Sequence, residues 1–184
     1  MSSKFHNHSG FTVTELILVI GVFAIIAVIA GPNFKNQLSN QKLKATARNI
    51  YSALQQAKLE AVEENETVAV AFSPAAYSPN GNSAQYQLFL DDGAGGGTAG
   101  NLSKESGEAL LATITMPKGI SLISASFTDG SVTTDKVGFT GQGLPLGSYS
   151  GSVQVRTDSR WYRISLSVAG NVKTEISDDG INWS

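Results

Sequence analysis

The chain has 184 residues, a formal net charge of -2 and no cysteine. This length is sufficient for one domain with a buried core and an additional segment. The lack of cysteine excludes disulfides, thiolate metal sites and a cysteine nucleophile. The nearly balanced charge gives no general electrostatic attraction to nucleic acid or to anionic lipid.

A long apolar run comes first in the chain. Residues 11–31 hold a single charged side chain, Glu15. As a helix, which rises about 1.5 Å per residue, this run would span the ~30 Å hydrocarbon core of a membrane. A secretory signal peptide is the alternative, but its apolar core is usually only about 7–15 residues long and an A-x-A-like site follows it. Here "AGPNFK" follows, so we predict a membrane-spanning helix.

Residues 32–65 show the pattern of an amphipathic helix. Apolar residues recur at intervals of four and three, which places them on one face, and charged residues fall beside that stripe. We predict one helix of about 50 residues, with an apolar half over 11–31 and an amphipathic half over 32–65. Gly31 and Pro32 are expected to kink it, because proline removes a backbone hydrogen bond. The stripe consists of Leu43, Ala47, Ile50, Leu54, Ala57 and Ala61.

Residues 66–184 change to a period of two. Short β-rich runs alternate with Gly, Asp, Asn and Pro, which indicates about eight antiparallel strands. In the seventh run, Ile164, Leu166 and Val168 are expected to share the buried face. The predicted fold is therefore α+β, with an antiparallel β-domain packed on the amphipathic helix. The runs are 67–73, 84–92, 110–116, 120–129, 136–141, 151–159, 160–170 and 172–180.

The start of the chain resembles a known signal. "SGFTVTEL" before a long apolar helix resembles the class III signal of type IV pilins and type II secretion pseudopilins, where a prepilin peptidase cuts after the glycine and methylates the new N-terminus. The resemblance implies a leader over 1–10 that ends at Gly10, a methylated Phe11, an assembly acid at Glu15 and a helix-bending Pro32. "VGFTGQGLP" and "RWYRISLSVAGNVKTE" resemble the GspH/FimT branch of minor pilins, which implies a pilin-like fold with a GspH-like domain over 66–184.

The resemblance also implies a function. We expect a minor pilin or pseudopilin, a structural subunit of a type II secretion pseudopilus or type IV pilus, without enzymatic activity or cofactor. Its partners would be other pilins through the N-terminal helix, the prepilin peptidase and the inner membrane. The leader carries Lys4 and no acid, which favours a cytoplasmic N-terminus. This predicts a single-pass protein of the bacterial inner membrane with a periplasmic C-terminal domain, assembled into a periplasmic or surface filament. A plain membrane-anchored periplasmic domain, uncut between Gly10 and Phe11, is a further alternative.

Glu15 needs a partner, because an unpaired carboxylate in lipid is costly. After cleavage, the α-amine of Phe11 would stay positively charged even when methylated. It is therefore a natural counter-ion for Glu15 of a neighbouring subunit. The alternative is that Glu15 only extends from near the helix end to the membrane surface.

A basic and aromatic cluster suggests a second function. Arg156, Arg160, Trp161 and Arg163 lie close in sequence, and stacking plus charge suits DNA. Some relatives in the FimT branch resemble DNA receptors for natural transformation, with a basic glycine-arginine motif near the C-terminus. Here the corresponding "GNVK" has one cation, Lys173, and acidic "EISDD" follows. A DNA-binding minor pilin stays the alternative, against a solvated strand with an exposed tryptophan.

The chain offers few candidates for metal binding or catalysis. His6 and His8 are its only histidines, and they lie in the expected leader, so we expect no metal site and no histidine base. Neighbouring acids on a strand, as in Asp178–Asp179, point to opposite faces. The glycine-rich stretch 91–101 has two interpretations: a calcium loop using Asp91, Asp92 and Asn101, or a flexible hairpin connection.

Overall fold

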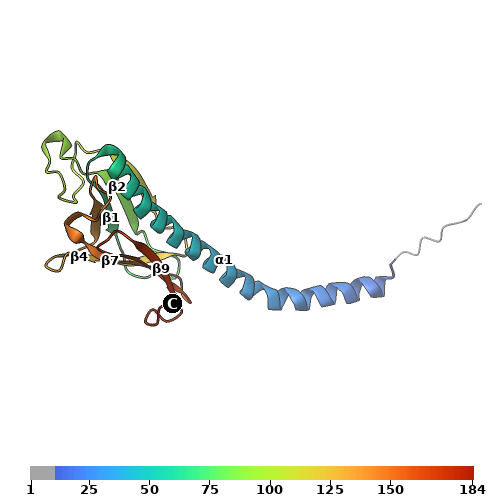
Figure 1. Cartoon of the computed structure of the whole chain (residues 1–184). Helices are drawn as coiled ribbons and strands as arrows, with labels where there is room; N and C mark the ends of the chain where they lie inside the picture. Colours follow the sequence, from blue (N-terminus) through green and yellow to red (C-terminus); the bar gives the residue numbers. More distant parts are fainter. Residues whose placement is uncertain (1–10) are drawn as a thin grey trace, which may run out of the picture. The chain divides into compact units, whose positions relative to one another are not determined.

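The computed structural model describes residues 11–184, with side chains over 11–27 and 37–184. Two compact units are present, one up to Leu38 and one from Ser39 to Ser184, and each is described by itself. The helix α1 (Val13–Glu64) belongs to both units, and all strands belong to the second. The predicted α+β class is thus confirmed (Figure 1).

In the second unit, α1 packs on the strands through the predicted stripe. All six predicted positions are fully buried in the core, whereas Leu59 on the opposite side is 68% exposed. After α1, Asn65 adopts a positive φ of 55°, the left-handed conformation in which many helices end. The spacing in the sequence therefore identified the buried face of this helix correctly.

The strands form two antiparallel sheets. Sheet A has the order β3-β2-β1-β6 and sheet B the order β5-β4-β7-β8-β9. Sheet A contains β1 (Val68–Ser73), β2 (Gln85–Leu90), β3 (Leu110–Thr115) and β6 (Lys136–Phe139). Sheet B contains β4 (Ser121–Thr128), β5 (Thr133–Thr134), β7 (Ser150–Arg156), β8 (Trp161–Leu166) and β9 (Val172–Ser177). Two short 3-10 helices, η1 (Ala94–Gly96) and η2 (Leu146–Ser148), lie in the connections.

Both sheets meet α1 in one hydrophobic core. Its residues include the helix stripe, Val70 and Phe72 of sheet A, and Val153 and Ile164 of sheet B. Phe72 links the sheets directly, since its ring lies 5.7 Å from Tyr86 and 5.9 Å from Phe127 between ring centroids. A smaller cluster of Ala69, Phe89 and Leu102 covers the other face of sheet A.

The loop that follows β6 packs against the end of α1. It contains a tight turn, in which the Gly143 N–H donates to the Thr140 carbonyl at 2.7 Å and the Thr140 N–H donates to the Leu144 carbonyl at 2.9 Å. A Cβ on Gly141 would come within 2.9–3.0 Å of Asn65. Any side chain there would push the loop away from the helix end, so the glycines of "TGQG" have a packing role.

Each of the eight expected runs overlaps an observed strand, and β5 is an addition of two residues. The expected alternation holds in β8, where Ile164 and Leu166 are buried. It was wrong for Val168, which is 58% exposed. The reason is that β8 ends at Leu166 and a turn follows, closed by the Gly170 N–H donating to the Ser167 carbonyl.

The buried stripe predicts that two leucines of α1 contribute differently to the free energy of unfolding. Leu54→Ala should lower the free energy of unfolding by about 2–5 kcal/mol, because it opens a cavity in the core. Leu59→Ala, at an exposed position, should change it by less than about 0.5 kcal/mol. Urea unfolding of the full chain in detergent, followed by circular dichroism, measures both. Equal effects would contradict the packing described for α1.

Candidate functional site

The first turn of α1 holds Glu15 in a fixed position. Its Oε2 atom accepts hydrogen bonds from the backbone N–H and the hydroxyl of Thr12, both at 2.9 Å. In return, the Glu15 N–H donates to the Thr12 hydroxyl at 3.3 Å. This reciprocal pair is a capping box, which satisfies two backbone donors at a helix start.

The sequence reasoning missed Thr12, although the signal was present. Threonine followed three residues later by glutamate, just before an apolar run, is the pattern of a capping box. Glu15 was interpreted only through a partner in another subunit or through its reach to the membrane surface. The structure gives the acid a role inside its own chain as well, because it holds the helix N-terminus together.

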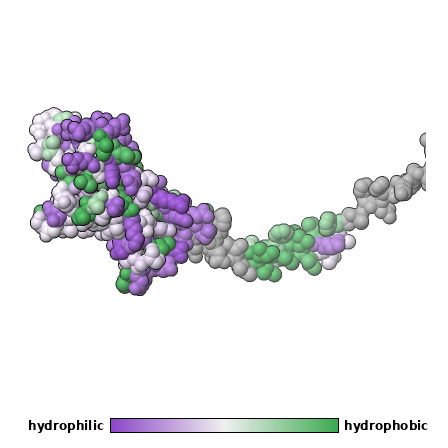
Figure 2. All heavy atoms as spheres, viewed as in Figure 1, coloured by the Kyte–Doolittle hydropathy of each residue, from purple (hydrophilic) through white to green (hydrophobic). Residues whose placement is uncertain are grey.

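Apolar side chains surround Glu15 on all sides of α1. Every large apolar residue described between Phe11 and Ile26 is at least 40% exposed, and Phe11 itself is 87% exposed. Figure 2 shows most of this stretch as an apolar surface, with a hydrophilic patch near its N-terminal end. A helix that is apolar all round is normally covered by other apolar groups. These residues are Phe11, Val13, Leu16, Ile17, Leu18, Val19, Ile20, Val22, Phe23, Ile25 and Ile26.

Some predictions fall outside the described residues. Gly10, His6 and His8 lie before residue 11, where the description begins. Gly31 and Pro32 lie within 28–36, whose side chains are not described, so the kink there stays a prediction. Among the helices described over 11–27 and 37–184, none combines the length and the apolarity of a membrane span.

The basic and aromatic cluster lies on sheet B, where neighbouring strands place its members side by side. Arg156 on β7 pairs in register with Trp161 on β8. The Arg156 guanidinium lies over the Trp161 ring, 4.2 Å from its centroid, and over the Tyr77 ring at 4.0 Å. Its Nε also donates to the Thr157 carbonyl at 2.9 Å. Arg156 is therefore held between two aromatic rings of its own chain.

The other cations of this cluster form ion pairs. Arg160 contacts Asp178 at 3.0 Å, Arg163 contacts Glu175 at 2.8 Å and Lys173 contacts Glu175 at 2.9 Å. The Lys173 and Arg163 hydrogen bonds lower the pKa of Glu175. The Arg163 guanidinium also lies over Trp183, 4.3 Å from the ring centroid.

These pairings bear on the DNA hypothesis. The side chains predicted to contact DNA do gather on sheet B, but Glu175, Asp178, Tyr77 and Trp183 engage them. Binding to phosphates would compete with these contacts and face two nearby carboxylates. Contact with DNA by Arg156, Arg160, Trp161, Arg163 or Lys173 stays a prediction.

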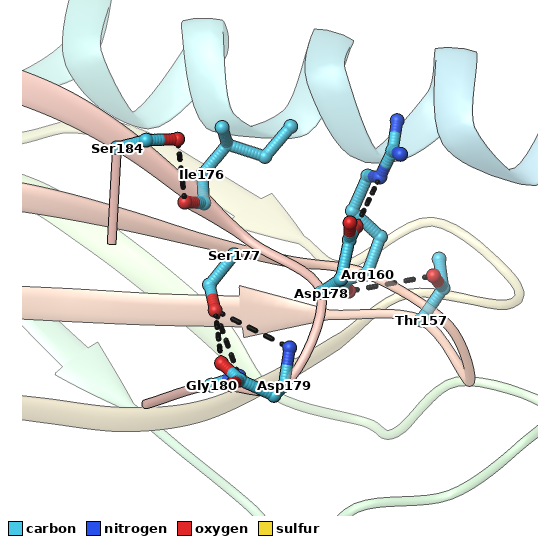
Figure 3. Close-up of polar contacts among 8 residues, drawn as sticks. All are labelled: Thr157, Arg160, Ile176, Ser177, Asp178, Asp179, Gly180 and Ser184. Carbon is cyan, nitrogen blue, oxygen red and sulfur yellow. Dashed lines mark hydrogen bonds and ion pairs between the residues drawn. The ribbon is translucent and has the colours of Figure 1, made fainter. Parts of the chain in front are cut away.

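The C-terminal segment forms a hairpin beside this cluster (Figure 3). Ser184 pairs with Ile176 through two backbone hydrogen bonds of 2.9 and 3.0 Å. At the turn, the Asp179 carboxylate accepts bonds from the backbone N–H groups of Ile181 and Asn182, both at 2.8 Å, and from the Ser177 hydroxyl at 2.7 Å. These donors, with Asn182 first, hold the pKa of Asp179 well below its usual range. Asp178 and Asp179 thus have separate structural partners, an arginine and a turn.

The acids of the glycine-rich stretch 91–101 also accept hydrogen bonds from their own chain. Asp91 is fully buried and accepts from the Leu102 N–H at 2.7 Å and the Gly100 N–H at 3.0 Å. Burial raises the pKa of Asp91, with the Glu108 charge acting in the same direction, although the backbone donors oppose it. Asp92 accepts from the Ala94 N–H at 3.0 Å. Within the described part of the chain, no group of three or more acidic, histidine or cysteine side chains has the arrangement of a metal site. Calcium binding by 91–101 stays a prediction.

A family model for the type II transport protein GspH matches residues 46–170, more than half of the chain. The chain belongs to the GspH family. The match covers most of α1 in the second unit and the strands from β1 to β8. As a member of this family, the protein is a minor pilin or pseudopilin, a structural subunit that assembles with other pilins into a filament of the cell envelope.

A solved structure shows a similar fold. The type IV minor pilin FimU of Pseudomonas aeruginosa (strain PAO1) is similar with a TM-score of 0.50 and 14% identity, over 79% of this chain and 94% of FimU. The minor pseudopilin EpsH from the type 2 secretion system of Vibrio cholerae gives a TM-score of 0.48 and 12% identity, over 76% of this chain and 98% of EpsH. No curated protein sequence matches the chain. The resemblance inferred from the sequence is therefore confirmed at the level of family and fold.

Asp179 should make the C-terminal hairpin sensitive to acid. Because its pKa is lower in the folded chain than in an unfolded one, its contribution to stability is present above about pH 3.9 and is lost as the pH falls through the folded value.

Asp179→Ala should remove protection of the Ile181 and Asn182 amides from hydrogen exchange at pH 7. Asp178→Ala, which loses only one exposed ion pair, should leave that protection in place. Unchanged exchange in Asp179→Ala would contradict this role.

Proposed function

We propose that this GspH-family chain is made as a precursor, cut by a prepilin peptidase between Gly10 and Phe11, and methylated on Phe11. The cut chain is stored as a single-pass protein of the inner membrane, with its β-domain in the periplasm. It then enters a type II secretion pseudopilus or type IV pilus through the helix over 11–31. Its role is structural, without catalysis.

One observation carries this proposal: a carboxylate is held at the start of a helix that exposes apolar side chains all round. Such a helix needs lipid or other apolar helices around it. Lipid would cover it before assembly, and the helices of neighbouring pilins would cover it in a filament. The same surface therefore suits storage in the membrane and packing in a filament core.

The geometry of Glu15 suits its proposed role in assembly. The two Thr12 donors both contact Oε2, and an ionised carboxylate offers about four acceptor positions on its two oxygens. Glu15 can therefore cap its own helix and still accept bonds from the cationic amine on Phe11 of a neighbour. Thr12 acts as a positioning residue, because it fixes the direction of the carboxylate that the amine meets.

Processing predicts a defined N-terminus. The protein purified from membranes of its native host should begin at Phe11 and carry one added methyl group. Gly10→Val should leave the chain uncut, since it removes the residue that the signal resemblance places before the cut. Intact mass and N-terminal sequencing measure both. An uncut Met1 terminus, in a host with an active prepilin peptidase, would contradict the proposal.

Assembly predicts a separate phenotype for Glu15. Glu15→Ala should be cut and inserted in the membrane normally but should be missing from sheared filaments, because no carboxylate meets the incoming amine. Thr12→Val should be incorporated less well, since Glu15 keeps its charge and the bond from the backbone N–H but loses the bond from the hydroxyl. Thr12→Ser should behave as the wild type. Immunoblotting of membrane and filament fractions gives the amount of each variant in filaments relative to the amount in the membrane. Normal incorporation of Glu15→Ala would remove this role.

A further inference from the structure

Strand β3 forms an open edge of sheet A. Among the described residues it pairs with β2 only, and its backbone makes no hydrogen bond to any other segment. Its sequence, "LLATIT", holds no charged residue, no proline and no glycine. Natural proteins usually shorten, charge or cover such an edge, because its free N–H and C=O groups can pair with another strand. The edge of β3 has none of these protections.

The other edges of the two described sheets are shortened or covered. Ser184 exchanges two backbone hydrogen bonds with Ile176, so the C-terminal segment covers part of the outer edge of β9. Strand β6 has four residues, begins with the charged Lys136 and is bridged to Pro145 through Phe139. Strand β5 has only two residues. An open edge is therefore a distinctive feature of β3.

The register of sheet A shows which backbone groups of β3 face outward. In an antiparallel pair, hydrogen-bonded and non-hydrogen-bonded positions alternate. The Met116 N–H donates to the Ala84 carbonyl at 2.9 Å, which fixes a bonded position. Thr115 and Thr113 stand an odd number of positions before Met116 in an unbroken register, so they are non-bonded positions. Their N–H and C=O groups point away from β2 and are available to a further strand.

A groove of about 220 Å³ lies between β3 and α1. Ala112 and Ile114, on the face of β3 opposite to the two threonines, form one wall. Ser52 and Gln56 of α1 lie on the other wall, and both are exposed. Alternate residues of a strand point to the same face. A strand added to β3 would therefore place every second side chain in this groove.

Tyr86 gives the groove a specific requirement. Its side chain lines the groove and is only 2% exposed, and its hydroxyl has no hydrogen-bond partner among the described residues. Among the described side chains, Asn40 Oδ1 is the atom that is both enclosed and unpaired, so the Tyr86 hydroxyl is not sealed in the core. Burial raises the pKa of Tyr86 to about 12, so the hydroxyl is a donor at neutral pH. An unpaired donor in a buried side chain is costly.

We propose that the open edge of β3 binds an extended segment of a different protein as an added strand, with threonine or serine side chains in the groove beside α1. Main-chain hydrogen bonds to Thr113 and Thr115 supply affinity, and the groove supplies specificity. Threonine suits the groove because its methyl group contacts Ile114 while its hydroxyl accepts the hydrogen bond of Tyr86. The inference depends neither on cleavage of the chain nor on filament assembly.

Charge and hydrogen bonding define this occupant. Neither β3 nor residues 49–57 of α1 include a charged side chain, so an ionised group in the groove would lose water without gaining a counter-ion. A second copy does not supply the missing acceptor. Its own β3, added antiparallel about a twofold axis, brings Ala112 and Ile114 to the groove, and neither side chain accepts a hydrogen bond from Tyr86.

Synthetic peptides test the proposal on the full-length chain in detergent. The peptide GKTKTKTKG should bind with its threonines in the groove, because its lysines must stay in solvent on the other face. Binding should protect the Thr113 and Thr115 amides from hydrogen exchange. The lysines then lie opposite these two residues, so the same peptide with N-methylated lysine amides keeps its charge but loses the ladder, and it should not bind. No protection by GKTKTKTKG, or equal protection by both peptides, overturns the proposal.

Two changes in the chain test the edge and the groove separately. Thr113→Pro removes an outward donor without breaking a bond to β2, and it should weaken binding of GKTKTKTKG about tenfold, whereas Thr113→Val should not. Ser52→Tyr fills the groove from an exposed helix position and should also weaken binding. Circular dichroism confirms that each variant is folded. Unchanged binding in folded Ser52→Tyr or Thr113→Pro overturns the proposal.

Tyr86→Phe tests the specificity. The wild type should prefer GKTKTKTKG to GKVKVKVKG about fivefold, the range of one neutral hydrogen bond, and Tyr86→Phe should lose this preference. A loss of packing alone would weaken both peptides equally, and that result overturns the proposed specificity. Sedimentation of the wild type without peptide tests the occupant: a dimer that Thr113→Pro dissociates would make a second copy the occupant and overturn the proposal.

Discussion

The packing of one face of α1 against two sheets is the constraint on which the second unit depends. Its six buried stripe residues meet the inner faces of sheet A and sheet B in a single core. A helix with a different spacing would turn polar groups into that core, where unpaired polar groups are costly. The position of the loop after β6 follows from the same packing, because Gly141 lies directly against Asn65, the residue that follows α1.

Charged side chains have different surroundings on sheet B and on α1. On sheet B, Glu175 and Asp178 neutralise cations that strand pairing brings close. The exposed Arg160–Asp178 pair adds little stability, but all three pairs remove free charge from that face. On α1, Glu15 lies in an apolar stretch of the helix, and the last turn has no basic residue. Within its own subunit, Glu15 is held by hydrogen bonds from Thr12 instead of by a charged partner.

The capping box lets Glu15 hold the start of its own helix and, in the assembly role that we propose for it, still meet a neighbouring subunit. Glu15 satisfies the Thr12 N–H inside its own chain, so the helix start stays ordered when no partner is present. An acid without such an anchor would combine a costly carboxylate with a frayed helix end. The anchor leaves acceptor positions open, which makes an incoming amine an addition rather than an exchange of partners.

The sequence by itself determined the class of fold, the buried face of α1, the approximate positions of eight strands and the family. These features depend on local periodicity and on a short contiguous motif, both of which survive without knowledge of contacts. Tertiary structure decided the rest: the pairing of Arg163 with Glu175, the stacking of Arg156 between Tyr77 and Trp161, the turn that exposes Val168, and the burial of Asp91. A period of two places a side chain on a face of a strand but does not say which strand lies beside it. Register and strand order supply those neighbours, and they arise only when distant parts of the chain pack together.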